Sequence, residues 1–172
     1  QERNTIWGFY VNGASKTNPV LNDKDFRKAL FYATNRDLMG KGIFKTFPST
    51  PYFISSICMV GDYQEGLRYR KTAEGQANVA ANNGFDVEIA KEHFNKAYEK
   101  NGNKKIFIEI IYFEGADTMK RIAEVAKEEY EKAFGSDRLE VTLRAMPSTA
   151  AYDAYKEGNF QLGIGARTQN AF

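Results

Sequence analysis

The sequence predicts a single α/β domain in which a mixed sheet is flanked by helices. Residues 105–165 alternate between strand-like and helix-like patterns in the order β-α-β-α-β. A helix between two successive strands implies that the strands are parallel and that the connection is right-handed. The chain has 172 residues, of which 42% are hydrophobic, and this is enough for one sizeable core but not for two.

Ile106–Phe113 is the expected inner strand of this sheet. One of its faces is wholly apolar, and Glu109 alone interrupts the other, so we expect both faces to be covered. Apolar and polar residues alternate over Leu139–Ala145, which indicates one exposed face and a position nearer the sheet edge. A third strand is expected at residues 160–165.

Two helices connect these three strands. Apolar residues recur at steps of three and four over Asp117–Phe134, charged residues take the opposite side, and Gly135 ends the pattern. A second helix, of about three turns on the ~3.6-residue repeat, is expected at residues 148–156. Ligands of open α/β sheets bind beyond the carboxyl ends of parallel strands. After the third strand, that end of the sheet is formed by residues 166–172.

The N-terminal part of the chain predicts one more strand and two helices. Thr5–Val11 has the composition of a strand and is followed by a turn-like Asn-Gly-Ala-Ser. Asn22 stands at the expected N-cap of a helix, and Asp23 and Asp25 place negative charge in its first turn. A short second helix is expected at residues 36–39, ended by the Gly-Lys-Gly that follows it.

The middle of the chain is less regular. Residues 44–69 have no sustained period, and an irregular run of this length is usually a functional loop or one that packs over another domain. Residues 72–82 are weakly helical. Asp86 is the expected cap of a stronger helix, whose inward face would include Ile89 and His93.

Composition excludes several classes of function. The 24 basic residues balance 22 acidic ones and form no block, so neither nucleic acid nor an anionic membrane is an expected partner. No apolar run reaches the ~18 residues that a membrane span requires. Cys58 is the single cysteine, which excludes an internal disulfide and metal sites made of paired thiolates. His93 is the single histidine, and we interpret it as a helix-face residue. No cofactor and no metal are expected.

Motifs for catalysis are absent as well. The sequence has no phosphate-binding glycine loop, nucleophile elbow, zinc motif or calcium loop. Paired carboxylates occur at Glu128-Glu129 and at Asp23 and Asp25, but these positions are a polar helix face and a cap, where a structural role is far commoner than acid–base work. The residues alone therefore predict a binding domain without catalysis.

Three segments resemble the extracellular solute-binding proteins of the dipeptide/oligopeptide class, which are the capture subunits of ABC importers. Residues 22–38 (NDKDFRKALFYATNRDL) resemble that family's D-x-x-V/F-R-x-A-L-x-Y-A-x-D/N-R helix. Residues 86–94 (DVEIAKEHF) resemble its D-x-x-x-A-K-x-x-L/F helix, and residues 152–162 (YDAYKEGNFQL) its Y-x-x-x-x-x-G-x-F-D-L segment. The resemblance covers nearly the whole chain, but only one lobe of a two-lobed protein.

The resemblance implies a fold, a ligand and a location. It implies that residues 1–172 are one lobe of a type II periplasmic-binding-protein-like fold, excised from a larger protein. It further implies an oligopeptide ligand, the membrane permease of an ABC importer as partner of the full-length protein, and a place on the extracellular or periplasmic face of the membrane with a lipid anchor. We expect a monomer and no enzymatic activity.

The resemblance also places the ligand-binding residues directly after the third strand, at Ala166, Arg167, Thr168 and Asn170. An extended peptide would add itself there as a strand and be held by main-chain hydrogen bonds. The sequence departs from the family pattern at Gln161, where an Asp is usual, and at Asn170, where an Asp commonly pairs with the peptide's amino group. A neutral amide gives up the charge-assisted part of that bond, roughly half of its strength.

Two other functions remain open from the sequence. A receptor lobe would sense a signalling peptide without importing it, and the residues do not separate this function from import. An enzyme domain would use residues 44–69 as a lid, with Asp62 or Glu65 as the base, although nothing in the sequence positions a partner for either carboxylate.

Overall fold

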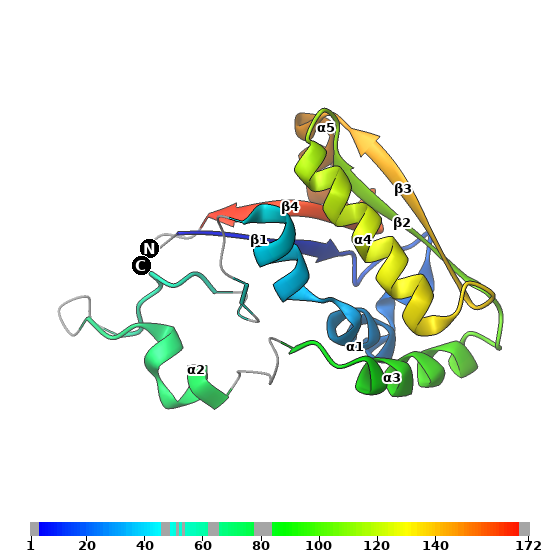
Figure 1. Ribbon diagram of the computed structural model, residues 1–172, viewed down its shortest axis with the longest axis horizontal. Helices are drawn as coiled ribbons and strands as arrows, with labels where there is room; N and C mark the ends of the chain where they lie inside the picture. Colours follow the sequence, from blue (N-terminus) through cyan, green and yellow to red (C-terminus); the bar gives the residue numbers. More distant parts are fainter. Residues whose placement is uncertain are drawn as a thin grey trace.

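A computed structural model describes residues 4–45, 49, 50, 52, 54–61, 66–77 and 84–168. These residues form a four-stranded sheet flanked by helices (Figure 1). The strands are β1 (Thr5–Val11), β2 (Ile106–Phe113), β3 (Leu139–Met146) and β4 (Leu162–Thr168). The helices are η1 (Pro19–Asn22), α1 (Lys24–Ala33), η2 (Leu38–Phe44), η4 (Tyr69–Lys71), α2 (Ala73–Ala77), α3 (Val87–Lys100), α4 (Asp117–Phe134) and α5 (Ser148–Glu157).

The sheet is mixed, with the strand order β1-β4-β2-β3. β2 is parallel to both β3 and β4, whereas β1 pairs with β4 in the antiparallel direction. This confirms the predicted mixed sheet, the inner position of β2 and the edge position of β3. The pairing of Thr5 with Thr168 places the start of β1 beside the end of β4.

One face of the sheet carries the main core. It packs against α4, and α1 and α3 pack against α4 in turn, so that helices cover this side (Figure 1). Phe94 of α3 stacks on Phe134 of α4 with ring centroids 4.3 Å apart, which joins the two helices. The buried strand residues on this face are Ile106, Ile108, Ile110, Leu139, Val141, Leu162 and Ile164.

The other face of the sheet is covered only in part. α5 packs against β2 and β4, and the Tyr152 ring of α5 contacts Phe113 at the carboxyl end of β2. Phe107, at the amino end of the same strand face, is 57% exposed. The prediction that both faces of β2 are covered is therefore wrong for this end, because α5 has only 10 residues and spans part of the strand.

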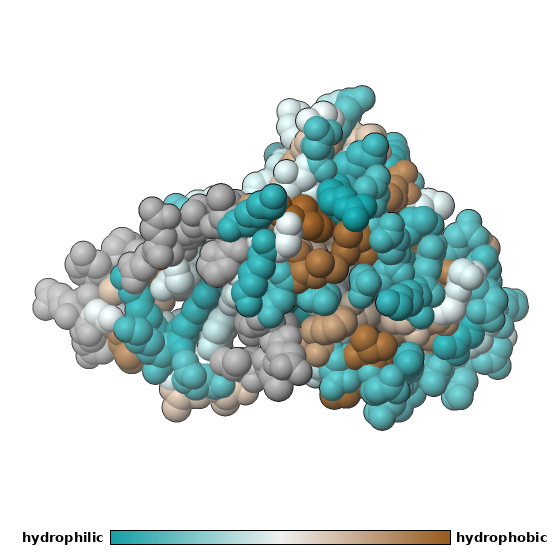
Figure 2. Space-filling view, viewed as in Figure 1, coloured by the Kyte–Doolittle hydropathy of each residue, from teal (hydrophilic) through white to brown (hydrophobic). Residues whose placement is uncertain are grey.

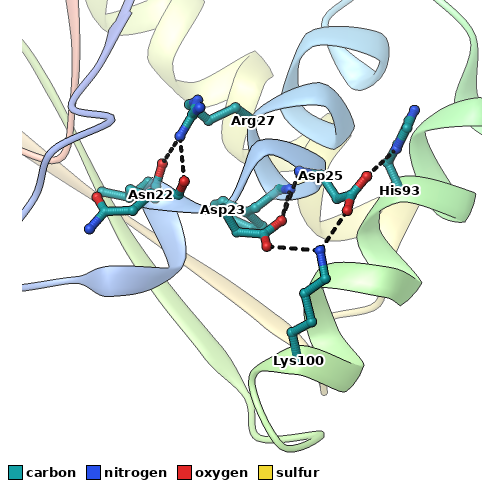
Figure 3. Close-up of polar contacts among 8 residues, drawn as sticks. Asn22, Asp23, Asp25, Arg27, His93 and Lys100 are labelled. Atoms are coloured by element: carbon teal, nitrogen blue, oxygen red, sulfur yellow. Dashed lines mark hydrogen bonds and ion pairs between the residues drawn. The ribbon is translucent and has the colours of Figure 1, made fainter.

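Helix α1 begins one residue later than predicted. Its N-cap is Asp23, not Asn22, because the Asp23 carboxylate accepts hydrogen bonds from the amides of Asp25 and Phe26 at 2.7 and 3.0 Å. Lys100, at the end of α3, bridges the carboxylates of Asp23 and Asp25 at 3.0 and 2.7 Å (Figure 3). These contacts tie the start of α1 to the end of α3.

His93 of α3 completes this network. Its Nδ1 lies 2.9 Å from Asp25 Oδ1 (Figure 3). The His93 ring also stacks on the Tyr32 ring. The hydrogen bond from Lys100, followed by that from His93, lowers the pKa of Asp25 to about 2. His93 thus joins two helices, as a structural helix-face residue would. Ile89, predicted to face inward on the same helix, is 37% exposed, so that prediction is wrong.

Two further boundaries differ from the predictions. The short helix expected at residues 36–39 runs on as the π-helical η2 through both glycines to Phe44, and the Lys45 amide closes it on the Gly40 carbonyl at 2.8 Å. β4 begins at Leu162 and continues to Thr168, three residues beyond the predicted end.

Within residues 44–69, the described part includes an isolated bridge between Met59 and Arg68. In the part of the chain that the structure describes, no helix is long and apolar enough to cross a membrane.

Candidate functional site

The outer half of β4 lacks a neighbouring strand on the side of β2. Parallel pairing between β2 and β4 stops at the pair Ile111–Gly163, although β4 continues to Thr168. Tyrosine hydroxyl groups replace the missing strand. The Tyr155 hydroxyl donates a hydrogen bond to the Ile164 carbonyl at 3.0 Å, and the Tyr152 hydroxyl accepts one from the Ala166 main-chain amide at 3.1 Å. Two side chains of α5 therefore form hydrogen bonds with the main-chain groups at this edge of β4.

Two glycines make room for the tyrosine rings. A Cβ atom on Gly163 would lie 2.3 Å from the Tyr155 ring, and one on Gly165 would lie 2.3 Å from Tyr10 Cε2. Tyr10 comes from β1, lies across Gly165 and donates its hydroxyl to the Ala166 carbonyl at 2.9 Å. Burial is the main cause that raises the pKa of both Tyr10 and Tyr155, so both remain neutral donors at pH 7.

The main-chain groups of Thr168 point to this same open edge. The main-chain amide of Asn12 donates a hydrogen bond to the Gln161 carbonyl at 2.9 Å. In an antiparallel ladder, only every second pair of opposite residues exchanges such main-chain hydrogen bonds. Counting from this pair, the ladder residues Ala166 and Thr168 both fall in non-hydrogen-bonded pairs. Their amides and carbonyls consequently face away from β1. At Ala166 the tyrosines occupy both groups, whereas Thr168 lies one further step along the edge.

The structure brings three of the four predicted ligand-binding residues together, but not after the strand. Ala166, Arg167 and Thr168 lie inside β4, paired with Trp7, Ile6 and Thr5 of β1. The prediction that they follow the strand is wrong, because pairing with β1 extends β4. Asn170 lies outside the described residues. Whether any of the four binds a ligand stays a prediction.

Gln161 has a structural role just before β4. Its side-chain oxygen accepts hydrogen bonds from the Glu109 amide and from Asn18 Nδ2, each at 3.0 Å. The Asn18 amide group also donates to the Phe107 carbonyl at 2.7 Å. Gln161 thus fastens the start of β4 to β2 and to the loop before α1.

A cavity of about 600 Å³ lies beside β1 and β4. Its walls include Trp7 and Phe9 of β1, Ile164 of β4, Phe44 of η2 and Tyr52 from the segment after η2. Trp7 and Phe44 contact each other with ring centroids 6.0 Å apart. Figure 2 shows apolar residues gathered in the middle of the viewed face, between the positions of η2 and α4 in Figure 1. The volume is within the range of small-molecule sites, about 300–1,000 Å³.

Thr34 and Tyr130 contribute a buried polar pair to the cavity wall. The Thr34 hydroxyl donates to the Leu30 carbonyl at 2.7 Å, so the Tyr130 hydroxyl is the donor in its 2.7 Å bond to Thr34. Burial raises the pKa of Tyr130. This pair joins the end of α1 to α4 and fixes one side of the cavity.

Arginines supply the charge of the cavity wall. Arg70 donates from Nε and Nη2 to the Ile54 carbonyl, at 2.9 and 2.6 Å, and its guanidinium lies 4.7 Å from the Tyr52 ring centroid. Arg36 donates to two carbonyls at the end of α1 and lies 4.1 Å from the Phe31 ring centroid. Burial is the largest cause that lowers the pKa of both arginines.

The site has the chemistry of a binding surface. Among the described residues, no group of three or more His, Cys, Asp or Glu side chains could hold a metal ion. Asp62 and Glu65, the carboxylates of the enzyme hypothesis, lie outside the described residues. Apolar walls, aromatic rings, guanidinium groups and an open strand edge can hold an extended polar ligand.

Sequence reasoning missed the tyrosines of this site and its arginines Arg36 and Arg70. Tyr10 and Tyr152 are 142 residues apart in the sequence, and only the pairing of β1 with β4 brings both to the main chain of Ala166. The two glycines of β4 were the available signal, because a glycine inside a strand often marks a close approach by another group.

Comparison with known proteins gives a family and a fold. The chain matches the model of the bacterial extracellular solute-binding proteins, family 5 Middle, over residues 1–172. A search of curated proteins found no match. Similar solved structures include OppA of Listeria monocytogenes bound to peptide, with a TM-score of 0.80, 15% identity and coverage of 97% of this chain and 31% of that chain.

Two other structures are similar over as much of the chain. AppA from Bacillus subtilis in complex with a nonapeptide has a TM-score of 0.74 at 14% identity, and 100% of this chain covers 32% of that one. The pheromone receptor PrgZ has a TM-score of 0.71 at 16% identity, with coverage of 98% and 31%. The chain therefore has the fold of one part of these proteins and spans about three-tenths of their length.

Proposed function

Because this chain belongs to the bacterial extracellular solute-binding proteins of family 5, we propose that it is one lobe of a protein that captures oligopeptides for an ABC importer. The observation that carries this proposal is the family match over residues 1–172, joined to a fold similar to that of peptide-bound OppA and AppA. The permease of the importer, a lipid anchor on the outer face of the membrane and a monomeric state belong to the same proposal.

Peptide binding in this proposal takes place at the end of β4. Ala166, Arg167, Thr168 and Asn170 form the ligand-binding segment, with different roles. The tyrosines already satisfy the main chain of Ala166, so this residue positions the segment. Thr168 presents its amide and carbonyl to the open edge, where an extended peptide adds as a further strand. Side chains of the peptide then reach the adjoining cavity.

One lobe supplies only one wall around such a ligand. Small ligands bind tightly where most of their surface is buried, and association also has to offset the loss of translational and rotational freedom. The isolated lobe should therefore bind peptides weakly or not at all. Tight binding requires a second wall from the rest of the protein.

Calorimetry on the full-length protein with a peptide library tests the function. Peptides should bind and release heat, whereas sugars and metal chelates should not. Tight binding of a sugar or a chelate, with no peptide bound, would remove the peptide assignment.

Thr168→Pro tests the proposed role of β4. Proline removes the amide that faces the open edge but no ladder hydrogen bond to β1, because Thr168 is in a non-hydrogen-bonded pair. Peptide affinity should fall about tenfold, the effect of one hydrogen bond of ~1.5 kcal/mol. Thr168→Ala keeps the amide and is the matched control. Equal affinities of the two variants would contradict binding by strand addition at this residue.

A sensing receptor is the second candidate. The similarity to the pheromone receptor PrgZ favours it specifically. Uptake of labelled peptide by cells that carry the full-length gene, compared with cells that lack it, separates the two functions, since a sensor alone would leave uptake unchanged.

A further inference from the structure

Three tyrosines meet at the open edge of β4, and two of them use their hydroxyl protons there. Tyr155 donates a hydrogen bond to the Ile164 carbonyl at 3.0 Å, and Tyr10 donates one to the Ala166 carbonyl at 2.9 Å. A carbonyl oxygen can only accept, so the direction of both bonds is fixed. The protein itself therefore occupies the hydroxyl protons of these two tyrosines.

Tyr152 has the opposite role at the same edge. A main-chain amide can only donate, so the Tyr152 oxygen is the acceptor in its 3.1 Å bond to the Ala166 amide. A phenol hydroxyl can accept one hydrogen bond and donate another at the same time. Among the residues that the structure describes, none accepts the hydroxyl proton of Tyr152. This proton needs an acceptor from outside that part of the chain.

The Tyr152 oxygen lies where a next strand of the sheet would place a carbonyl oxygen. Its distance from the Ala166 nitrogen is that of a normal ladder hydrogen bond, about 2.7–3.2 Å. β2 no longer pairs with β4 at this level. The following β4 residue whose main-chain groups face the open edge is Thr168, which is exposed. A peptide strand that pairs with Thr168 therefore reaches the Tyr152 hydroxyl at one side.

The surroundings of Tyr152 also prepare its hydroxyl as a donor. Hydrogen bonds in a chain polarise one another, so a hydroxyl that accepts a bond from an amide becomes a stronger donor. The Tyr152 ring is held between two other rings, with centroids 5.4 Å from that of Phe113 and 5.6 Å from that of Tyr155. A side chain that is fixed before binding loses little conformational freedom when a ligand binds.

We propose that the Tyr152 hydroxyl binds a main-chain carbonyl of the captured peptide, next to the peptide residue that pairs with Thr168. This inference rests on the proposed function and adds a ligand-binding residue to it. The hydrogen bonds then run from the Ala166 amide to the Tyr152 oxygen, and from the Tyr152 hydroxyl to the peptide carbonyl. Every peptide residue has such a carbonyl, so the contact requires an extended main chain and accepts any side chain.

Tyr152→Phe removes this donor and keeps the aromatic ring. In calorimetry on the full-length protein with a set of alanine-rich peptides of graded length, the variant should bind about tenfold more weakly, the effect of one hydrogen bond. Tyr155→Phe is the matched control, because it also removes a hydroxyl of α5 and leaves a main-chain group of β4 without its partner. The control should lose less than about twofold in affinity. Equal losses in the two variants would overturn the assignment, since the disturbed edge of β4 would explain both.

Replacement of single peptide bonds in the ligand identifies the contact directly. The tightest-binding peptide of the set is prepared with an alkene in place of each peptide bond in turn, which removes the carbonyl and the N–H at that position. At one position the loss of affinity should be at least about threefold smaller in Tyr152→Phe than in the unmodified protein, because the variant has already lost this bond. Losses of the same size in both proteins at every position would overturn the proposal.

These measurements separate the inference from the proposed function. Peptide binding that is equally tight with and without the Tyr152 hydroxyl would overturn the inference and leave peptide capture intact. No binding of any peptide of the set by the full-length protein would contradict the proposed function and this inference together.

Discussion

Two glycines that face each other across β1 and β4 give a sharp test of the tyrosine arrangement. Gly8 and Gly165 form a ladder pair in the same sheet. A Cβ atom on Gly165 would lie 2.3 Å from the Tyr10 ring, whereas a Cβ atom on Gly8 would meet no other group within 4 Å. Gly165→Ala must therefore displace Tyr10, and Gly8→Ala displaces nothing.

The expected cost follows from what Tyr10 loses. Displacement breaks its hydrogen bond to the Ala166 carbonyl, which contributes ~1 kcal/mol. It also removes its ring contact with Tyr155, where the centroids are 5.3 Å apart, and such pairs contribute about 1 kcal/mol. Poorer packing of the displaced ring adds ~1 kcal/mol. Replacing a strand glycine by alanine returns roughly 0.5–1 kcal/mol. Gly165→Ala should thus lower the free energy of unfolding by about 2 kcal/mol.

Urea denaturation of the lobe, followed by circular dichroism, measures this difference. Gly8→Ala is the matched control and should raise the free energy of unfolding by about 0.5 kcal/mol, since it gains only strand propensity. Equal free energies of unfolding for the two variants would refute the claim that Tyr10 packs on Gly165, because the effect would then come from the strands themselves.

Two further predictions concern the helices. Tyr130→Phe removes the donor to the buried Thr34 hydroxyl and should lower the free energy of unfolding by ~1 kcal/mol; a urea midpoint equal to that of the unmodified protein would show that this bond contributes nothing. The lowered pKa of Asp25, about 2 against the ordinary 3.8, stabilises the fold fully above about pH 4, and this stabilisation is lost as the pH falls toward 2. In melting curves recorded between pH 5 and pH 2, Lys100→Met should show a smaller fall in Tm than the control Lys91→Met. The control breaks the exposed pair of Lys91 with Glu88 on the same helix. Equal falls in Tm would show that Lys100 does not cause the lowered pKa of Asp25.

Most of the secondary structure could be predicted from local patterns. β2 and α4 were predicted with the boundaries that the structure has, because a run of apolar residues and a helical repeat over 18 residues are strong signals. The end of β4 was predicted three residues too early. Its last residues, Ala166, Arg167 and Thr168, carry no strand pattern of their own and are extended because β1 pairs with them.

The candidate site was predictable in its place along the chain but not in its chemistry. The resemblance of residues 152–162 to a solute-binding family directed attention to Ala166, Arg167 and Thr168. It gave no indication that Tyr10 and Tyr152 already bind the main chain of Ala166. Hydrogen bonds between residues more than 100 positions apart depend on strand order, and no local pattern encodes strand order.

By itself, the sequence determined an α/β domain with an inner strand parallel to a strand nearer the edge, a long amphipathic helix and membership of a solute-binding family. Only the tertiary structure decided that three of the four predicted binding residues lie within a strand, that tyrosines from two elements satisfy its open edge, and that arginines from four parts of the chain line one cavity. The physical reason is that periodicity reports which residues leave water, whereas packing alone decides which of them meet.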